Sequence, residues 1–126
     1  MRKIEEEIYT AVLHLSPVSG SNTVVAPNKM GGVACWLHGN KVFESWVDKR
    51  GKRHCSVDDC GWATSTTRSR VNACLDGWGA SWRLRGRACD RVEDRDGTKV
   101  PVSSMPVSSD YVEKALKKAR GEKTSE

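Results

Sequence analysis

Apolar residues recur at helical spacing in three stretches of the chain, which predicts three amphipathic helices. The first is residues 2–15, with one apolar face made of Ile4, Ile8, Ala11, Val12 and Leu15. The second begins after Thr64 and places on one face Val71, Cys74, Leu75 and Trp78. The third is residues 110–120, with Asp110 as the expected N-cap and with one face made of Val112, Ala115, Leu116 and Ala119.

Between the helices, apolar and polar residues alternate with the period of two that is typical of strands. A meander of short antiparallel strands is expected at 23–26, 33–38, 42–47 and 53–57, with turns at 39–40, 48–51 and 58–59. Residues 80–92 and 99–102 predict further strands around a turn at Asp96-Gly97, and residues 16–22 predict a loop. The expected fold class is therefore α+β, with a small curved antiparallel sheet packed on a central helix and with N-terminal and C-terminal helices.

The length of 126 residues suits one domain with its own core. We expect this α+β domain to span residues 1–102. Residues 103–109, with Pro106 inside, predict a linker to the C-terminal helix at 110–120, and residues 121–126 predict a flexible tail.

The balance of charge and the cysteines indicate a compartment and a class of partner. The net charge is +5, which favours acidic partners such as nucleic acid or an acidic protein face. No apolar run approaches the roughly 20 residues that a bilayer requires, and residues 1–7 are too charged for a signal peptide. Five cysteines, an odd number, suit reduced thiols. We expect a cytoplasmic protein with no membrane contact.

Basic residues gather at two places that are candidates for partner binding. Three share one face of the expected strand at 80–92: Arg83, Arg85 and Arg87. Four crowd one turn: Lys49, Arg50, Lys52 and Arg53. Arg68 of the central helix can extend this surface. The alternatives are a solvated face, a contact with a protein, and a site for single-stranded nucleic acid with nearby indoles.

Two further patterns allow more than one interpretation. A zinc set can be drawn from Cys35, His38, Cys55 and Cys60, but residues i and i+3 of a strand point to opposite faces, and the cysteines are equally typical of small core residues. The hydroxyl run at 64–67 predicts a helix N-cap, with an anion site beside Arg68 or Arg70 as the alternative; both arginines are expected outside the core.

The chain lacks the common catalytic motifs. No nucleophile elbow, phosphate-binding loop or His-x-Glu deaminase pattern occurs. Asp58-Asp59 is typical of a turn. A Cys–His nucleophile made of Cys55 or Cys60 with His38 stays open as an alternative. We expect a protein that is not an enzyme and that needs no cofactor.

Two motifs give the chain a resemblance. They are Leu37-His38-Gly39-Asn40-Lys41-Val42 and Gly61-Trp62-x-Thr64-x-Thr66-Thr67-x-x-Arg70-x-Asn72-Ala73-x-Leu75. With them the chain resembles, over residues 23–100, small uncharacterised proteins encoded by bacteriophages and prophages; its cysteine content and its terminal helices differ from theirs.

That resemblance implies a phage protein that binds and inhibits or redirects a host protein complex. The first candidate is a defence complex of the CRISPR type. No catalytic residue is implied. A basic nucleic-acid-binding module and a small zinc-binding protein stay open as alternatives.

Overall fold

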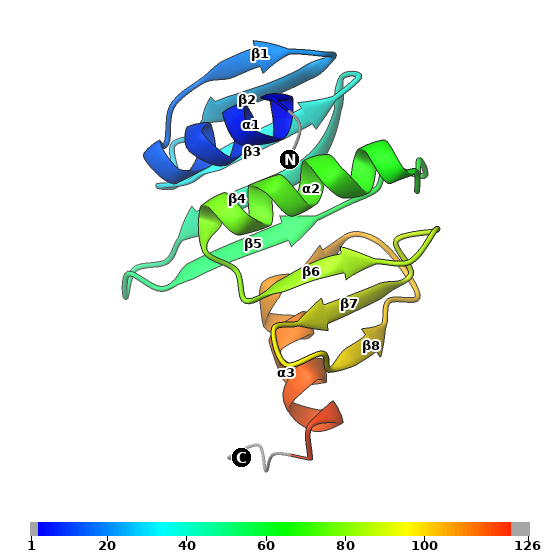
Figure 1. The fold of residues 1–126 in the computed structure, drawn as a ribbon. Helices are drawn as coiled ribbons and strands as arrows, with labels where there is room; N and C mark the ends of the chain where they lie inside the picture. Colours follow the sequence, from blue (N-terminus) through cyan, green and yellow to red (C-terminus); the bar gives the residue numbers. More distant parts are fainter. Residues whose placement is uncertain (1–2, 122–126) are drawn as a thin grey trace.

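Helix α2 (Ser65–Trp78) lies at the centre of the fold, between two antiparallel sheets (Figure 1). The structure, a computed structural model, describes residues 3–121. The large sheet has, in spatial order, the strands β1 (Val18–Gly20), β2 (Thr23–Pro27), β3 (Val33–Leu37), β4 (Asn40–Val47), β5 (Arg53–Val57) and β9 (Val107–Ser108). The small sheet consists of β6 (Trp82–Arg85), β7 (Arg91–Asp94) and β8 (Lys99–Pro101).

Two more helices complete the α+β fold that the sequence predicts. Helix α1 (Lys3–His14) packs across α2 and covers the large sheet near β1 and β2. Helix α3 (Ser109–Ala119) contacts β5 and β9 on one side and β8 on the other. All three expected helices are confirmed within the described residues; Arg2, the predicted first residue of the first helix, and residues 122–126 of the predicted tail lie outside them.

Turn geometry shifts two of the expected strand boundaries. The β3–β4 turn is centred on His38 (φ 51°) and Gly39 (φ 80°), one residue earlier than predicted, and Asn40 already belongs to β4. Two positive φ values in a row match the twist of a two-residue hairpin turn. The single strand expected at 80–92 is wrong: it divides into β6 and β7, because Gly86 (φ 88°) turns the chain.

Short strands form in two segments for which the sequence predicts none. Strand β1 lies inside the expected loop at 16–22. Strand β9 lies inside the expected linker at 103–109, and pairs with β5 through Val107 and Ser108. The N-cap of α3 is Ser108, whose hydroxyl accepts from the Tyr111 N–H, and not Asp110 as predicted. The hydroxyl of the buried Ser109 then accepts from the Cys55 N–H at 3.0 Å.

The core confirms the predicted face of α2. Its four expected apolar residues are all buried, together with residues of α1 and of both sheets. Arg70, however, is buried and not outside: its side chain donates to the Thr23 hydroxyl at 3.3 Å and lies 3.9 Å from the Glu5 carboxylate. A single arginine on α2 thus connects this helix to β2 and to α1.

The Asn72 side chain of α2 makes two hydrogen bonds to the small sheet. The Asn72 carbonyl accepts from the Leu84 N–H at 2.8 Å, and the Asn72 amide donates to the Leu84 carbonyl at 3.1 Å. One amide side chain therefore satisfies both backbone groups of Leu84 on the edge of β6 that faces the helix, as a neighbouring strand would.

Helices α1 and α2 approach each other closely at Gly77. A Cβ atom at Gly77 would lie 2.7 Å from the Tyr9 carbonyl oxygen and 2.9 Å from the Val12 Cβ. We expect Gly77→Ala to lower the free energy of unfolding by about 1–3 kcal/mol, because overpacking against backbone outweighs the gain of up to about 1 kcal/mol in helix propensity. Thermal unfolding measures this effect.

Gly20→Ala is the matched control. Its added Cβ would lie 3.8 Å from the Ile4 Cδ1, an ordinary contact, and we expect an unchanged or slightly raised melting temperature. Equal melting temperatures for Gly77→Ala and the native chain would contradict the close approach of the two helices.

Candidate binding site

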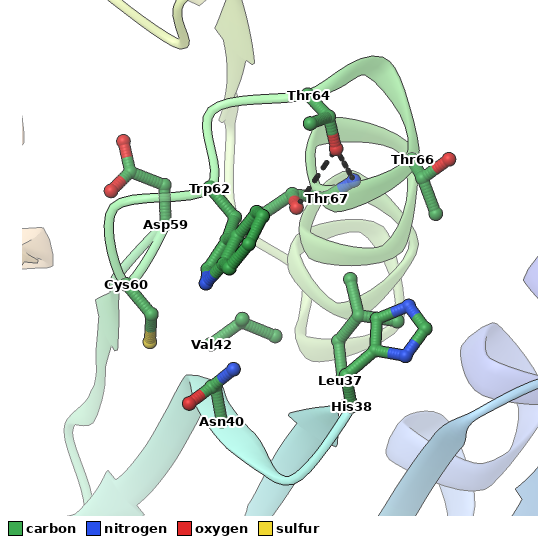
Figure 2. A pocket seen from close by; sticks show the side chains of 10 residues that line it. All are labelled: Leu37, His38, Asn40, Val42, Asp59, Cys60, Trp62, Thr64, Thr66 and Thr67. Carbon is green, nitrogen blue, oxygen red and sulfur yellow. Dashed lines mark hydrogen bonds between the residues drawn. The ribbon is translucent and has the colours of Figure 1, made fainter.

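The two sequence motifs, far apart in the chain, line one pocket of about 540 Å³ (Figure 2). It lies between the β3–β4 turn and the start of α2, and the loop that joins β5 to α2 closes its side. Its lining residues are Leu37, His38, Asn40, Val42, Asp59, Cys60, Trp62, Thr64, Thr66 and Thr67. The motifs that mark the resemblance therefore build a single place on the surface.

Hydrogen bonds between residues two or three positions apart fix the loop before α2, which carries Trp62 at the pocket. The Asp58 carboxylate accepts from the Cys60 N–H at 2.8 Å, and the Asp59 carboxylate accepts from the Gly61 N–H at 2.9 Å. The Trp62 N–H donates to the Asp59 carbonyl at 2.8 Å. These bonds confirm that the acidic pair forms a turn. Trp62, which follows this turn, is 65% exposed.

Thr64, in the hydroxyl run, is the N-cap of α2, which confirms the first of the two interpretations of this run. The Thr64 hydroxyl accepts from the Thr67 N–H at 3.2 Å and lies 3.1 Å from the Thr67 hydroxyl. The two arginines considered for an anion site are engaged elsewhere: Arg70 is buried, and the Arg68 guanidinium donates to the Gly86 carbonyl. No lysine or arginine is among the described residues that line the pocket.

The pocket combines an apolar floor with a polar rim. Leu37 and Val42 lie at its base beside the Trp62 indole, while His38 and Asn40 lie across from the indole in Figure 2. Within residues 3–121, the side chains of His38, Asn40 and Thr66 have no hydrogen bond of their own. This arrangement suits a ligand that packs an apolar group on the indole and exchanges hydrogen bonds with the rim.

The predicted basic residues come from two regions of the fold. The β4–β5 turn carries Lys49, Arg50, Lys52 and Arg53, whereas β6 and the β6–β7 turn carry Arg83, Arg85 and Arg87 (Figure 1). Arg68 belongs to the second group through its bond to Gly86. Because the β6–β7 turn interrupts the expected strand, Arg87 does not share a strand face with the other two.

Several of these side chains already have partners inside the protein. Arg83 donates to Asp76 at 2.6 Å, Arg85 lies 3.6 Å from Glu93, and Lys52 lies 3.6 Å from Asp110. The Arg53 guanidinium donates to the Trp78 carbonyl at 3.1 Å and lies over the Trp78 ring, 4.8 Å from its centroid. In the part of the chain that the structure describes, Lys49, Arg50 and Arg87 make no side-chain ion pair or hydrogen bond.

The four residues of the zinc set do not converge. Cys35 and Cys55 are buried in the core, His38 is exposed in the β3–β4 turn, and the Cys60 thiol donates to the Lys41 carbonyl at 3.2 Å. Residues 3–121 contain no group of three or more His, Cys, Asp or Glu side chains placed to hold a metal ion. The geometry of these residues therefore does not favour the zinc alternative.

The thiols are poorly suited to nucleophilic chemistry. Burial raises the pKa of Cys55 to about 12, although the hydrogen bond with Ser109 acts in the opposite direction. Burial also raises the pKa of Cys60, and the Asp58 and Asp59 carboxylates raise it further. A Cys–His nucleophile needs a lowered thiol pKa, so these environments disfavour that alternative.

The exposure of Trp62 at a pocket was not predicted from the sequence, because tryptophan is most often largely buried. The signal that was present is the position of Trp62, directly after the Asp58–Gly61 turn and two residues before the N-cap, where the chain does not yet have a buried face.

The fold and the pocket together define a small α+β protein with one candidate pocket between the β3–β4 turn and α2, and with no membrane-crossing helix among its described residues. The profile of the Kyanoviridae Gp96 protein family matches residues 1–90, which include both motifs and the whole pocket. The chain belongs to this family of phage proteins. No curated protein and no solved structure matches it significantly.

The buried Cys55 predicts a loss of stability in alkali. Its thiol ionises near pH 9 in an unfolded chain and near pH 12 in the folded one, so its contribution to stability is complete below pH 9 and is lost as the pH rises toward 12. We expect Cys55→Ala to flatten the fall of unfolding free energy over this range, by up to about 1.4 kcal/mol per pH unit. Urea unfolding at a series of alkaline pH values measures it.

The native chain and Cys55→Ala are compared at each pH, so that the ionisation of other groups cancels. Parallel curves for the two proteins would show that folding does not raise the pKa of Cys55.

Proposed function

We propose that the protein acts without catalysis, by binding a host protein and thereby inhibiting or redirecting a host complex. The observation that carries this proposal is the Trp62 indole, 65% exposed at a pocket with an apolar floor. Exposed tryptophans beside such hollows are typical anchors of protein interfaces. Inhibition by occupying a surface needs an anchor of this kind and no catalytic group.

The charge of the pocket favours a protein segment over a ligand that carries phosphate. Among the described lining residues Asp59 is the one acid, and no lysine or arginine offsets it. An apolar or aromatic side chain of a partner can pack on Trp62, with Leu37 and Val42 beneath it. The His38 and Asn40 side chains can then bond to the backbone of the same segment.

Membership of a phage protein family supports a target in the infected bacterium. Within this proposal a bacterial defence complex, such as a CRISPR effector, is the first candidate. The net charge of +5 favours a partner with an acidic surface. Arg68, which lies in the first turn of α2 and bonds to the Gly86 carbonyl of the β6–β7 turn, can extend the contact together with Arg87.

Loss of the indole tests the anchor. We expect the tagged native protein to retain a specific host protein from bacterial lysate, and Trp62→Ala to lose it, with affinity for the purified partner reduced at least roughly 30-fold by removal of about 2 kcal/mol or more. Mass spectrometry identifies the partner, and calorimetry measures the affinity.

Tyr111→Ala is the matched control, since Tyr111 is also an aromatic residue on the surface, 59% exposed, but lies on α3. It should retain the partner fully. A partner that is retained equally by the native protein and Trp62→Ala would exclude the pocket as the anchor.

The defence target has its own test. Bacteria that carry a CRISPR system directed against a test phage should again allow plaques when they express the native protein, and should not when they express Trp62→Ala. Plaque counts on strains with and without the CRISPR system measure this effect. Partner binding without any restoration of plaques would place the target outside this class of defence complex.

A further inference from the structure

One face of the large sheet is covered by no helix of residues 3–121. Helices α1 and α2 pack on the face that contains the core residues Val25, Cys35 and Phe43, and α3 meets the sheet at the edge formed by β5 and β9. Since neighbouring residues of a strand point to opposite faces, the other face, here called the outer face, is made of Val24, Ala26, Ala34, Trp36, Glu44, Trp46, His54 and Ser56.

Aromatic rings lie on this outer face at two places. Trp46 and His54 are paired across β4 and β5, and their rings stack with centroids 5.8 Å apart and an interplanar angle of 11°. Trp36 lies on β3 and is paired with Val24 of β2, which is 41% exposed. From the strand register, the two indoles are roughly 13 Å apart along the strands. Both indoles are partly exposed, and Ala34 between them is buried.

Three basic residues lie near the Trp46 end of the outer face, where the carboxylates of Asp48 and Asp110 contact His54. The β4–β5 turn directly after it carries Lys49 and Arg50, which are exposed. The Val47 N–H donates to the Met30 carbonyl at 2.9 Å, so the turn with Lys29 lies beside the same end. The Asp48 carboxylate is held by His54 at 2.8 Å and by backbone N–H groups of its own turn, and the bond to His54 lowers the pKa of Asp48.

We propose that the outer face binds single-stranded nucleic acid, with bases stacked on Trp36 and Trp46 and phosphates contacted by Lys29, Lys49 and Arg50. Sheet faces with aromatic residues and a basic border bind single strands in this way, because every base has a ring face to stack and every nucleotide has a phosphate. This site is separate from the Trp62 pocket, whose floor residues Leu37 and Val42 lie in the core on the other side of the sheet.

Fluorescence anisotropy with labelled oligonucleotides of about 20 nucleotides tests the proposal, using single-stranded DNA, single-stranded RNA and a DNA duplex at about 50 and 200 mM salt. We expect single strands to bind more tightly than the duplex. Trp46→Ala should weaken binding roughly 5- to 150-fold. Lys49→Glu with Arg50→Glu should weaken it and should lower the salt slope by roughly 1.4, the share of two phosphate contacts.

Lys117→Glu with Lys118→Glu is the matched control, because it makes the same change in net charge in the last turn of α3. It should leave most of the binding intact, and so should Trp62→Ala. If Trp46→Ala does not fold, Trp46→Phe and the exposed turn variant carry the test.

Three results would overturn the proposal. The first is no binding of single strands at the lower salt concentration. The second is an equal loss of affinity in the turn variant and in the α3 control. The third is native affinity in a folded Trp46→Ala. Loss of a host protein by the outer-face variants, with no nucleic acid bound by the native chain, would assign this face to a protein partner instead.

Discussion

The burial of α2 on three sides is the constraint on which the rest of the structure depends. The helix must accept α1, the large sheet and the small sheet at once, and it does so with a different residue toward each. Gly77 lets the α1 backbone approach, Arg70 bonds to Thr23 of the large sheet, and Asn72 bonds to Leu84 of the small sheet. A helix with only an apolar stripe would leave the polar groups of these neighbours unpaired.

This central position also explains where the pocket forms. The N-cap at Thr64 fixes the first turn of α2, and the polar contacts further along the helix fix its direction over the sheet. The β3–β4 turn and the loop before α2 are thereby brought to opposite sides of one hollow. The two motifs that carry the resemblance thus have two roles. Residues 37–42 and the start of the 61–75 motif line the pocket, and the rest of the 61–75 motif positions the helix.

Local rules predicted most of the fold, because its helices and hairpins follow from spacing and turn chemistry within short segments. They failed where a distant contact decides the outcome. Nothing near Arg70 in sequence announces a buried partner, since Thr23 and Glu5 are more than 40 positions away. The short strand β9 exists only because β5 offers it an edge. The Trp62 pocket was hidden for the same reason: its two sides come from motifs that meet only after folding.

The local hydrogen bonds of the loop that presents Trp62 have a consequence for the kinetics and thermodynamics of recognition. The chain has already lost the conformational entropy of this loop during folding, so a ligand does not bear that cost again. Association should then be close to rigid docking, with differences in affinity among ligands expressed mainly in how slowly they leave. Burial of so large an indole should also give binding a negative heat-capacity change.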